Sequence, residues 1–401
     1  MQGEAVDLAS STSPAVYAAL CSSAGGRQSI CVWIKRTYDL LHGRRMSRSS
    51  RAEIPLLFEP IEEDAGGSSP LTCQVAECDL IPRKPCTDVV VHGHVRAPGG
   101  VPTTSMIAAL RMGDGWKQIA VVGDRRVSWR PGTRPSFGAP EPFVELPLSW
   151  RRAFGGIDAS LTRPEPADIG ELLVALDPET HPGAYPRNPA GTGWVINADE
   201  RVLHGLRLPN FELPEHPLTP DRLVHGAAEN WTRAPEPAGF GWVGQSWFPR
   251  STLLGLEPAY ASLPEHLRGG WLELAPQLDE GPDPRFFCGA SEGLRQVGVR
   301  GDEPIELHGF FHEGPLVTAL PGERPEIIIA FRRQPLDLRS RIHTIELYPD
   351  QHLASVLWVA EAEPPQQLPL HLPAGDIDSF DLLEGVDVIL DGVALPRELM
   401  G

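Results

Sequence analysis

The pattern of apolar and polar positions predicts a series of short strands in the first third of the chain. Residues 29–40, with the sequence SICVWIKRTYDL, alternate β-branched and aromatic residues with polar ones, as expected for a half-buried strand. Four more stretches suggest strands: 72–80, 88–97, 105–114 and 116–129. Turn signals such as APGG and GDG separate them, with no helical pattern between. The prediction is a mainly β fold with antiparallel sandwich- or barrel-like sheets.

The pattern changes between residues 131 and 284. Prolines are frequent there, and only 168–176 and 263–276 have a helical pattern. The segment is rich in tryptophan: Trp194, Trp231, Trp242, Trp247 and Trp271. We interpret it as irregular backbone held by buried aromatic side chains. Strand patterns resume over 303–360 and predict a second β meander.

These changes of pattern predict an organisation along the chain. We expect a flexible arm, a β-rich domain in three parts and an acidic tail containing GDIDSFDLLEGVDVILDGVAL. The predicted bounds are 1–28 for the arm, 29–130, 131–284 and 285–362 for the three parts of the domain 29–362, and 363–401 for the tail.

Composition narrows the classes of function. The 401 residues include 40 glycines and 42 prolines, so much of the backbone runs through turns, yet 41% hydrophobic residues exclude a disordered chain. The net charge of −18 argues against nucleic acid as a partner, because phosphate binding needs clustered Lys and Arg. No apolar run approaches the roughly twenty residues of a membrane span, and six cysteines are too few for a disulfide scaffold. No secretory signal is recognisable, so we expect a cytoplasmic protein that binds no membrane.

One short motif raises the question of catalysis. Residues 286–294, FFCGASEGL, contain the G-x-S-x-G pattern of the hydrolase nucleophile elbow, with Ser291 at its centre. That elbow requires a strand before the serine and a helix after it. The following residues, GLRQVGVRGDEP, contain too many glycines for a helix. We therefore favour an ordinary loop serine and no enzyme activity, with a serine hydrolase using Ser291 as the alternative.

Two further patterns suggest ligands. Residues 239–244, GFGWVG, match a dinucleotide-binding fingerprint, but the flanking prolines fit neither its strand nor its helix, so we expect a turn and no cofactor. His92 and His94 lie two apart in a predicted strand and would face the same side, as a metal-binding pair does. Because no further ligands lie at suitable spacing, we predict no metal, although this pair leaves the question open.

Eight segments in order carry a family resemblance: DVVVHGHVRAPGG, VVGDRRVSW, RRAFGG, YPRNPAGTGW, LPNFELPEHP, PAGFGWVGQSWFPR, DPRFF and GPLVTALPG. The chain resembles, from about Ser29 to about Trp358, the family catalogued as domain of unknown function 2169, which is encoded alongside bacterial type VI secretion genes. The resemblance implies a cytoplasmic adaptor or chaperone that stabilises a secreted effector protein and helps load it onto the secretion spike. Its partners would be the effector and, in addition, a spike-tip or spike protein. A structural component of the secretion apparatus is a further alternative.

The resemblance brings no catalytic residues with it. The positions that match its motifs are Arg152, Phe154, Gly155, Gly156, Arg187, Asn188, Pro189, Gly191, Pro209, Asn210, Gly239, Phe240, Gly241, Pro249, Arg250, Asp283, Pro284, Arg285 and Phe286. These residue types favour bracing of irregular backbone, with contact to the effector as the alternative.

A binding surface for an effector requires exposed aromatic groups or an unpaired strand edge. The candidate surface consists of Trp194, Trp231, Phe240, Trp242, Trp247 and Arg250. The alternative is that these tryptophans form the core of the irregular segment.

Overall fold

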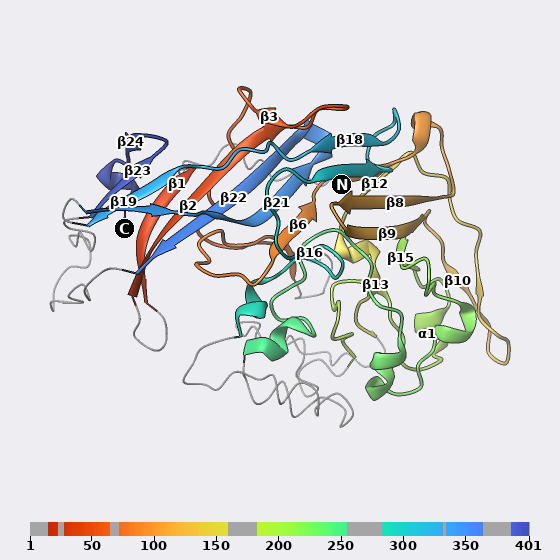
Figure 1. Ribbon diagram of the computed structural model, residues 1–401. Coiled ribbons are helices and arrows are strands. Elements are labelled where there is room, and N and C mark those ends of the chain that lie inside the picture. The colour runs from red at the N-terminus through yellow and green to blue at the C-terminus, as the bar shows by residue number, and fades with distance from the viewer. Residues whose placement is uncertain are drawn as a thin grey trace.

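The computed structural model describes residues 15–22, 28–64, 72–158, 183–254, 283–331, 334–363 and 386–400. It is a mainly β protein with several, mostly antiparallel sheets, which confirms the predicted class (Figure 1). Within the described residues no sheet closes into a barrel. The stretches 168–176 and 263–276, predicted to be helical, and Trp271 lie outside the described residues.

The largest sheet has seven strands drawn from both ends of the chain. Its order is β1–β2–β22–β21–β6–β16, and β3 pairs with β2. All neighbours are antiparallel except β6 and β21, which are parallel. The strands are β1 (Val16–Ser22), β2 (Gln28–Asp39), β3 (Ser47–Arg48), β6 (Thr87–Val91), β16 (Arg295–Gln296), β21 (Arg341–Tyr348) and β22 (Leu353–Ala362).

Two smaller sheets complete the main framework. The five-stranded sheet has the order β15–β9–β8–β17–β18, and the four-stranded sheet has the order β20–β19–β23–β24. The strands of the first are β8 (Ser105–Met112), β9 (Gly115–Val122), β15 (Phe211–Glu212), β17 (Pro304–His308) and β18 (Leu316–Ala319). Those of the second are β19 (Ile327–Phe331), β20 (Gln334–Leu338), β23 (Val386–Leu390) and β24 (Val393–Ala394).

The remaining elements are short. Four two-stranded ladders pair β4 (Ile61–Asp64) with β5 (Thr72–Ala76), β7 (His94–Arg96) with β12 (Glu145–Pro147), β10 (Val127–Ser128) with β11 (Ser136–Phe137), and β13 (Phe154–Gly155) with β14 (Thr192–Gly193). The described helices are α1 (Glu200–Leu203) and the 3₁₀ turns η2 (Pro98–Gly100), η3 (Trp150–Arg152), η5 (Pro220–Arg222), η6 (Ala228–Arg233), η7 (Arg250–Leu254), η9 (Pro284–Phe287), η10 (Pro349–Gln351) and η12 (Arg397–Leu399). The frequent prolines and glycines explain why so few helices are found.

The predicted arm and tail both contribute strands. β1, inside the segment predicted as an arm, pairs with β2 over its whole length. β23, inside the segment predicted as an acidic tail, pairs with β19, and Ala18 forms a bridge with Met400. The stretch predicted as one meander contributes to three sheets, because β17 and β18, β19, and β21 and β22 find different neighbours.

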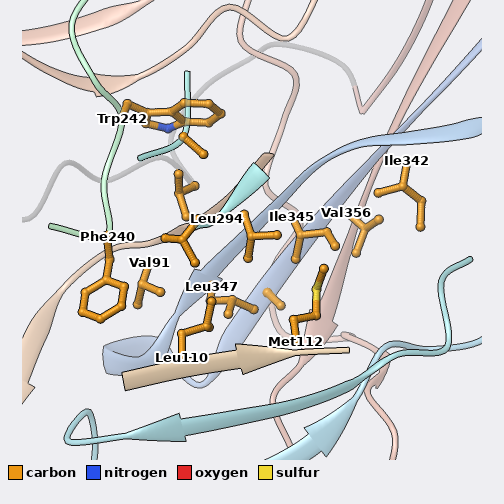
Figure 2. Packing of buried hydrophobic residues seen from close by; sticks show 14 of the residues in the cluster. Val91, Leu110, Met112, Phe240, Trp242, Leu294, Ile342, Ile345, Leu347 and Val356 are labelled. Atoms are coloured by element: carbon orange, nitrogen blue, oxygen red, sulfur yellow. The ribbon is translucent and has the colours of Figure 1, made fainter. Parts of the chain in front are cut away.

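The seven-stranded and five-stranded sheets share one hydrophobic core. Figure 2 shows Leu110 and Met112 of β8 beside Ile345 and Leu347 of β21, and all four side chains are buried. A second cluster lies in the irregular middle segment around Phe154 and includes Tyr185 and Trp194. The aromatic residues of that segment are therefore divided between this second cluster and the main core, which contains Trp242 and Trp247.

A buried ionic cluster pins the segment before β6 to the large sheet. The ammonium group of Lys35 lies 2.9 Å from carboxylate oxygens of both Asp79 and Glu346, and all three side chains are buried. Asp79 also accepts a hydrogen bond of 2.8 Å from the backbone amide of Leu57. Burial alone would disfavour the charge, but the two carboxylates together raise the pKa of Lys35. The alternating pattern of β2 gave no sign that its lysine points inward.

Candidate functional site

The motif residues around β13 hold a tight crossing of two backbone segments. Asn188 is fully buried, and its side-chain amide donates to the carbonyls of Trp150 (2.8 Å) and Phe154 (3.1 Å). Gly155 has a φ of 148°, and a Cβ at this position would lie 2.0 Å from the carbonyl oxygen of Asn188. Only glycine fits such a close approach. Gly155 and Asn188 therefore shape the backbone here.

A second group of motif residues ties β9 to β15. Arg152 donates to the side-chain oxygen of Asn210 at 2.9 Å and to Asp124 at 3.3 Å. Asn210 donates in turn to the carbonyl of Val122 and to Asp124, both at 2.9 Å. Burial would raise the pKa of Asp124, but the hydrogen bond from Asn210 and the charges of Arg207 and Arg152 together lower it. The network fixes the loop that follows β9.

Arg250 connects three separate parts of the chain. Its guanidinium donates to the carbonyl oxygens of Phe286 and Val243, both at 2.7 Å, and forms an ion pair with Glu77. The guanidinium also stacks on the Phe286 ring, 5.0 Å from its centroid. Because Arg250 is only 2% exposed, it braces the PAGFGWVGQSWFPR and DPRFF segments in this structure. The sequence analysis missed Glu77, which lies inside the stretch 72–80 predicted as a strand and directly follows β5 in the structure.

The proposed aromatic binding surface is not exposed. The exposed fractions are Trp194 2%, Trp231 6%, Phe240 1%, Trp242 1% and Trp247 2%. These side chains belong to the two clusters described above. The expectation of an exposed surface made by these residues and Arg250 is therefore wrong for this conformation, because folding buries their large apolar areas. The positions of these tryptophans agree with the alternative, that they are core residues.

The two glycine-rich patterns pack against each other. Ser291 is 3% exposed, and its hydroxyl donates to the carbonyl of Gly239 at 2.9 Å. Trp242 and Ala290 form a backbone bridge between the same segments. After Ser291 the chain enters strand β16 rather than a helix. The strand–turn–helix geometry of a nucleophile elbow is therefore not formed at Ser291.

His92 and His94 do not share a strand face. β6 ends at Val91, and Gly93 turns the backbone with a φ of 101° before β7 begins. His92 lies 3.3 Å from Glu346, on the parallel neighbour β21, and His94 lies 2.8 Å from Asp350. The prediction of one continuous strand was wrong because the glycine breaks it. Each histidine faces its own carboxylate.

The outer face of the five-stranded sheet carries exposed apolar side chains. Trp116 of β9 is 47% exposed and Val317 of β18 is 42% exposed. The strand register places Trp116 opposite Arg111, Arg111 opposite Glu306, and Glu306 opposite Val317, so these four residues form one row across the sheet. Ile107, also on β8 and 48% exposed, lies on the same face as Arg111.

A hollow of about 550 Å³ adjoins the edge of this sheet. Apolar residues line much of it: Leu40, Leu41, Phe311, Pro315 and Leu316. The ion pair of Arg51 and Asp39, at 2.9 Å, lies at the same hollow. His42, another lining residue, accepts a hydrogen bond of 3.3 Å from the amide of Val317. The hollow and the outer sheet face thus meet at β18.

The architecture and these contacts define a mainly β protein in which the side chains of Asn188, Asn210 and Arg250 donate hydrogen bonds to backbone carbonyls. The chain belongs to the family described as uncharacterized protein conserved in bacteria (DUF2169), whose family model matches residues 25–359. No curated protein and no solved structure shows significant similarity to the chain. None of the helices in the described part of the chain is long and apolar enough to cross a bilayer.

Proposed function

We propose that this protein is a non-enzymatic adaptor that binds a type VI secretion effector in the cytoplasm, stabilises it and assists its loading onto the secretion spike. The resemblance to a family encoded beside type VI secretion genes supports this function. The contacts of the motif residues are consistent with a non-enzymatic protein, because the side chains of Asn188, Asn210 and Arg250 form hydrogen bonds with internal backbone and side-chain groups. Binding of a partner then falls to outward-facing side chains.

The observation that carries the proposal is the outer face of the five-stranded sheet. Ile107, Trp116 and Val317 are each more than 40% exposed on this face, and the Arg111–Glu306 pair lies between Trp116 and Val317 in the row. Aromatic and aliphatic groups around a polar pair are typical of surfaces that bind another protein. We place the effector on this face.

The test combines effector capture with effector secretion. Ile107→Asp and Trp116→Asp each place a charge on the outer face and leave the buried core unchanged. We therefore expect both variants to lose capture of the effector encoded in the same gene cluster. Val393→Asp is the matched control, because Val393 is 70% exposed on β24, in a different sheet. We expect this control to retain capture. All three should keep the unfolding temperature of the parent protein.

Cells carrying the Trp116→Asp gene should show a lower effector level and less secretion than cells with the parent gene. Equal effector levels and secretion after deletion of the whole gene would contradict the adaptor function. Retained capture by both outer-face variants would contradict the position of the surface. Export of the protein itself together with the spike would favour a structural component of the apparatus.

A further inference from the structure

Two cysteines from distant parts of the chain meet beside the central sheet. The thiol of Cys86 donates a hydrogen bond to the sulfur of Cys288, with 2.8 Å between the sulfurs, although 202 positions separate the residues. Cys288 is 2% exposed, whereas Cys86 is partly exposed. A reagent in solution can therefore reach one sulfur, and the second lies directly behind it.

The backbone around this pair is fixed on both sides. The amides of Gly289 and Ala290 each donate to the carboxylate of Asp88 at 3.1 Å. Asp88 is fully buried, and it pairs with Arg295 in the ladder between β6 and β16. These bonds hold the residue after Cys288 against a residue two positions after Cys86. A bond between the sulfurs therefore requires little backbone movement.

The hydrogen bond between the two sulfurs shifts their pKa values in opposite directions. The hydrogen bond from Cys86 and the charge of Lys84 lower the pKa of the Cys288 thiol, whereas burial and the Asp88 carboxylate raise it, and the net result is a lowered pKa. The same hydrogen bond, burial and the Asp88 carboxylate all raise the pKa of the Cys86 thiol. The Lys84 side chain is 2% exposed and lies 2.8 Å from Asp88. Cys288 is therefore the sulfur of the pair that more readily becomes a thiolate, which is the attacking species in disulfide exchange.

We propose that Cys86 and Cys288 are a redox-responsive pair that closes to an intramolecular disulfide by exchange with the disulfide of a small thiol such as glutathione. Cys86 passes its proton across the hydrogen bond to the Cys288 thiolate, and the Cys86 thiolate so formed attacks one sulfur of the small disulfide. This forms a mixed disulfide and releases one small thiolate, which takes the proton from Cys288. The Cys288 thiolate then attacks the Cys86 sulfur and releases the second. The two protons lost by the cysteines end on the two released thiols, so the protein is oxidised by two electrons and the small disulfide is reduced.

A metal site is the competing interpretation of the same residues. Donor atoms of Cys86, Asp88 and Cys288 all lie within 4.8 Å of one another, which is compatible with a divalent ion such as Zn²⁺. However, the Asp88 carboxylate already accepts two backbone amides and the Lys84 ammonium group. A divalent cation would replace these bonds and lie close to a buried positive charge. The contacts therefore favour the disulfide.

Closure of the bond would join two elements of the fold. Cys288 directly follows η9, which contains Phe286, a hydrogen-bond partner of Arg250. Cys86 directly precedes β6 in the large sheet. The disulfide would link the DPRFF segment covalently to the sheet and restrict the unfolded chain, so the oxidised protein should unfold at a higher temperature than the reduced one.

The experiment equilibrates the full chain in glutathione buffers of increasing oxidised fraction, followed by alkylation and peptide mass spectrometry without reduction. We expect a peptide pair joined through Cys86 and Cys288, two hydrogens lighter than the reduced pair, appearing in one transition. The unfolding temperature should rise across that transition. Cys78→Ser is the matched control, because Cys78 is also partly exposed, and it should behave as the parent does. Cys86→Ser should lose both the linked peptide and the temperature rise.

Cys86→Ser carries the test if Cys288→Ser fails to fold, because the Cys86 side chain is partly exposed and its replacement removes no core volume. The proposal is overturned if both thiols remain open to alkylation in every buffer. It is also overturned if oxidation stops at a glutathione adduct on Cys86, or if Cys21 and Cys31, which lie on the paired strands β1 and β2, form the only linkage. Stoichiometric zinc whose removal by a chelator exposes Cys86 and Cys288 to alkylation would assign the pair to a metal instead.

Discussion

Replacement of Arg250 by methionine tests whether the motif residues brace the fold or contact a partner. Methionine keeps much of the apolar stem but removes the guanidinium that binds Glu77 and the carbonyls of Phe286 and Val243. The Glu77 side chain is 7% exposed, so its charge would be left buried without its cation. Loss of one partner from a buried ion pair costs about 3–5 kcal/mol.

Urea unfolding measures this cost. The free energy of unfolding falls with urea concentration by about 3 kcal/mol per M, the upper end of the usual range of this slope, as expected for a large protein. Arg250→Met should therefore lower the urea midpoint by about 1 M or more. The double variant Arg250→Met/Glu77→Leu removes both charges together, and we expect it to recover part of the loss. Arg250→Lys keeps the charge but cannot reach all three acceptors, so its midpoint should fall between those of Arg250→Met and the parent.

The outcome separates two roles for Arg250. A loss below about 1 kcal/mol, the usual value for an exposed ion pair, would refute the assignment of Arg250 as a buried brace. A variant of unchanged stability that no longer captures the effector would instead place Arg250 at the binding surface.

Three other expectations follow from single residues. Gly155→Ala should lower the free energy of unfolding by about 3 kcal/mol, because the backbone is strained and the new Cβ overlaps the Asn188 carbonyl. The control Gly132→Ala, with a φ of 80° and nothing within 4 Å of its Cβ position, should lower it by about 1–2 kcal/mol. Urea unfolding of the two variants measures both losses. Burial lowers the pKa of His343 to about 3, so below an unfolded-state pKa of about 6.5 only the unfolded chain gains this proton. Stability should therefore fall as pH falls from about 6.5 to about 3, less steeply in His343→Gln, and an equal slope in that variant would contradict the assignment. A fluorophosphonate probe should leave Ser291 unlabelled, because its hydroxyl is buried and donates to a carbonyl; labelling that disappears in Ser291→Ala would restore the hydrolase alternative.

Alternation along the sequence predicted individual strands well. The patterns at 29–40, 105–114 and 116–129 contain β2, β8 and β9. The prediction that 29–40 is half-buried was wrong, because both faces of β2 are covered: Ile34 lies in the main core and Trp33 in a separate buried cluster on the other face. The pairing was not predictable in the same way. β2 lies beside β22, and β6 lies parallel to β21, and no local pattern specifies a neighbour so distant in the sequence.

The candidate site was predictable in part. The sequence indicated that the motif glycines and asparagines shape backbone, and the contacts of Gly155 and Asn188 fit that interpretation. The direction in which a side chain points in an irregular segment has no sequence period, so the sequence left open whether the tryptophans form a binding surface or a core. Trp116 was missed because it lies in an ordinary strand pattern, where alternation predicts an outward position without indicating its use.

The pairing of β2 with β22 has a consequence for biosynthesis. β2 lies near the start of the chain and is bonded along ten positions to a strand that the ribosome makes more than three hundred residues later. During translation the edge of β2 that will pair with β22 therefore remains unpaired, and an unpaired strand edge can pair with other chains. The slow step in making this protein should be the arrival of its C-terminal strands, and ribosome stalling before Leu353 should yield aggregates.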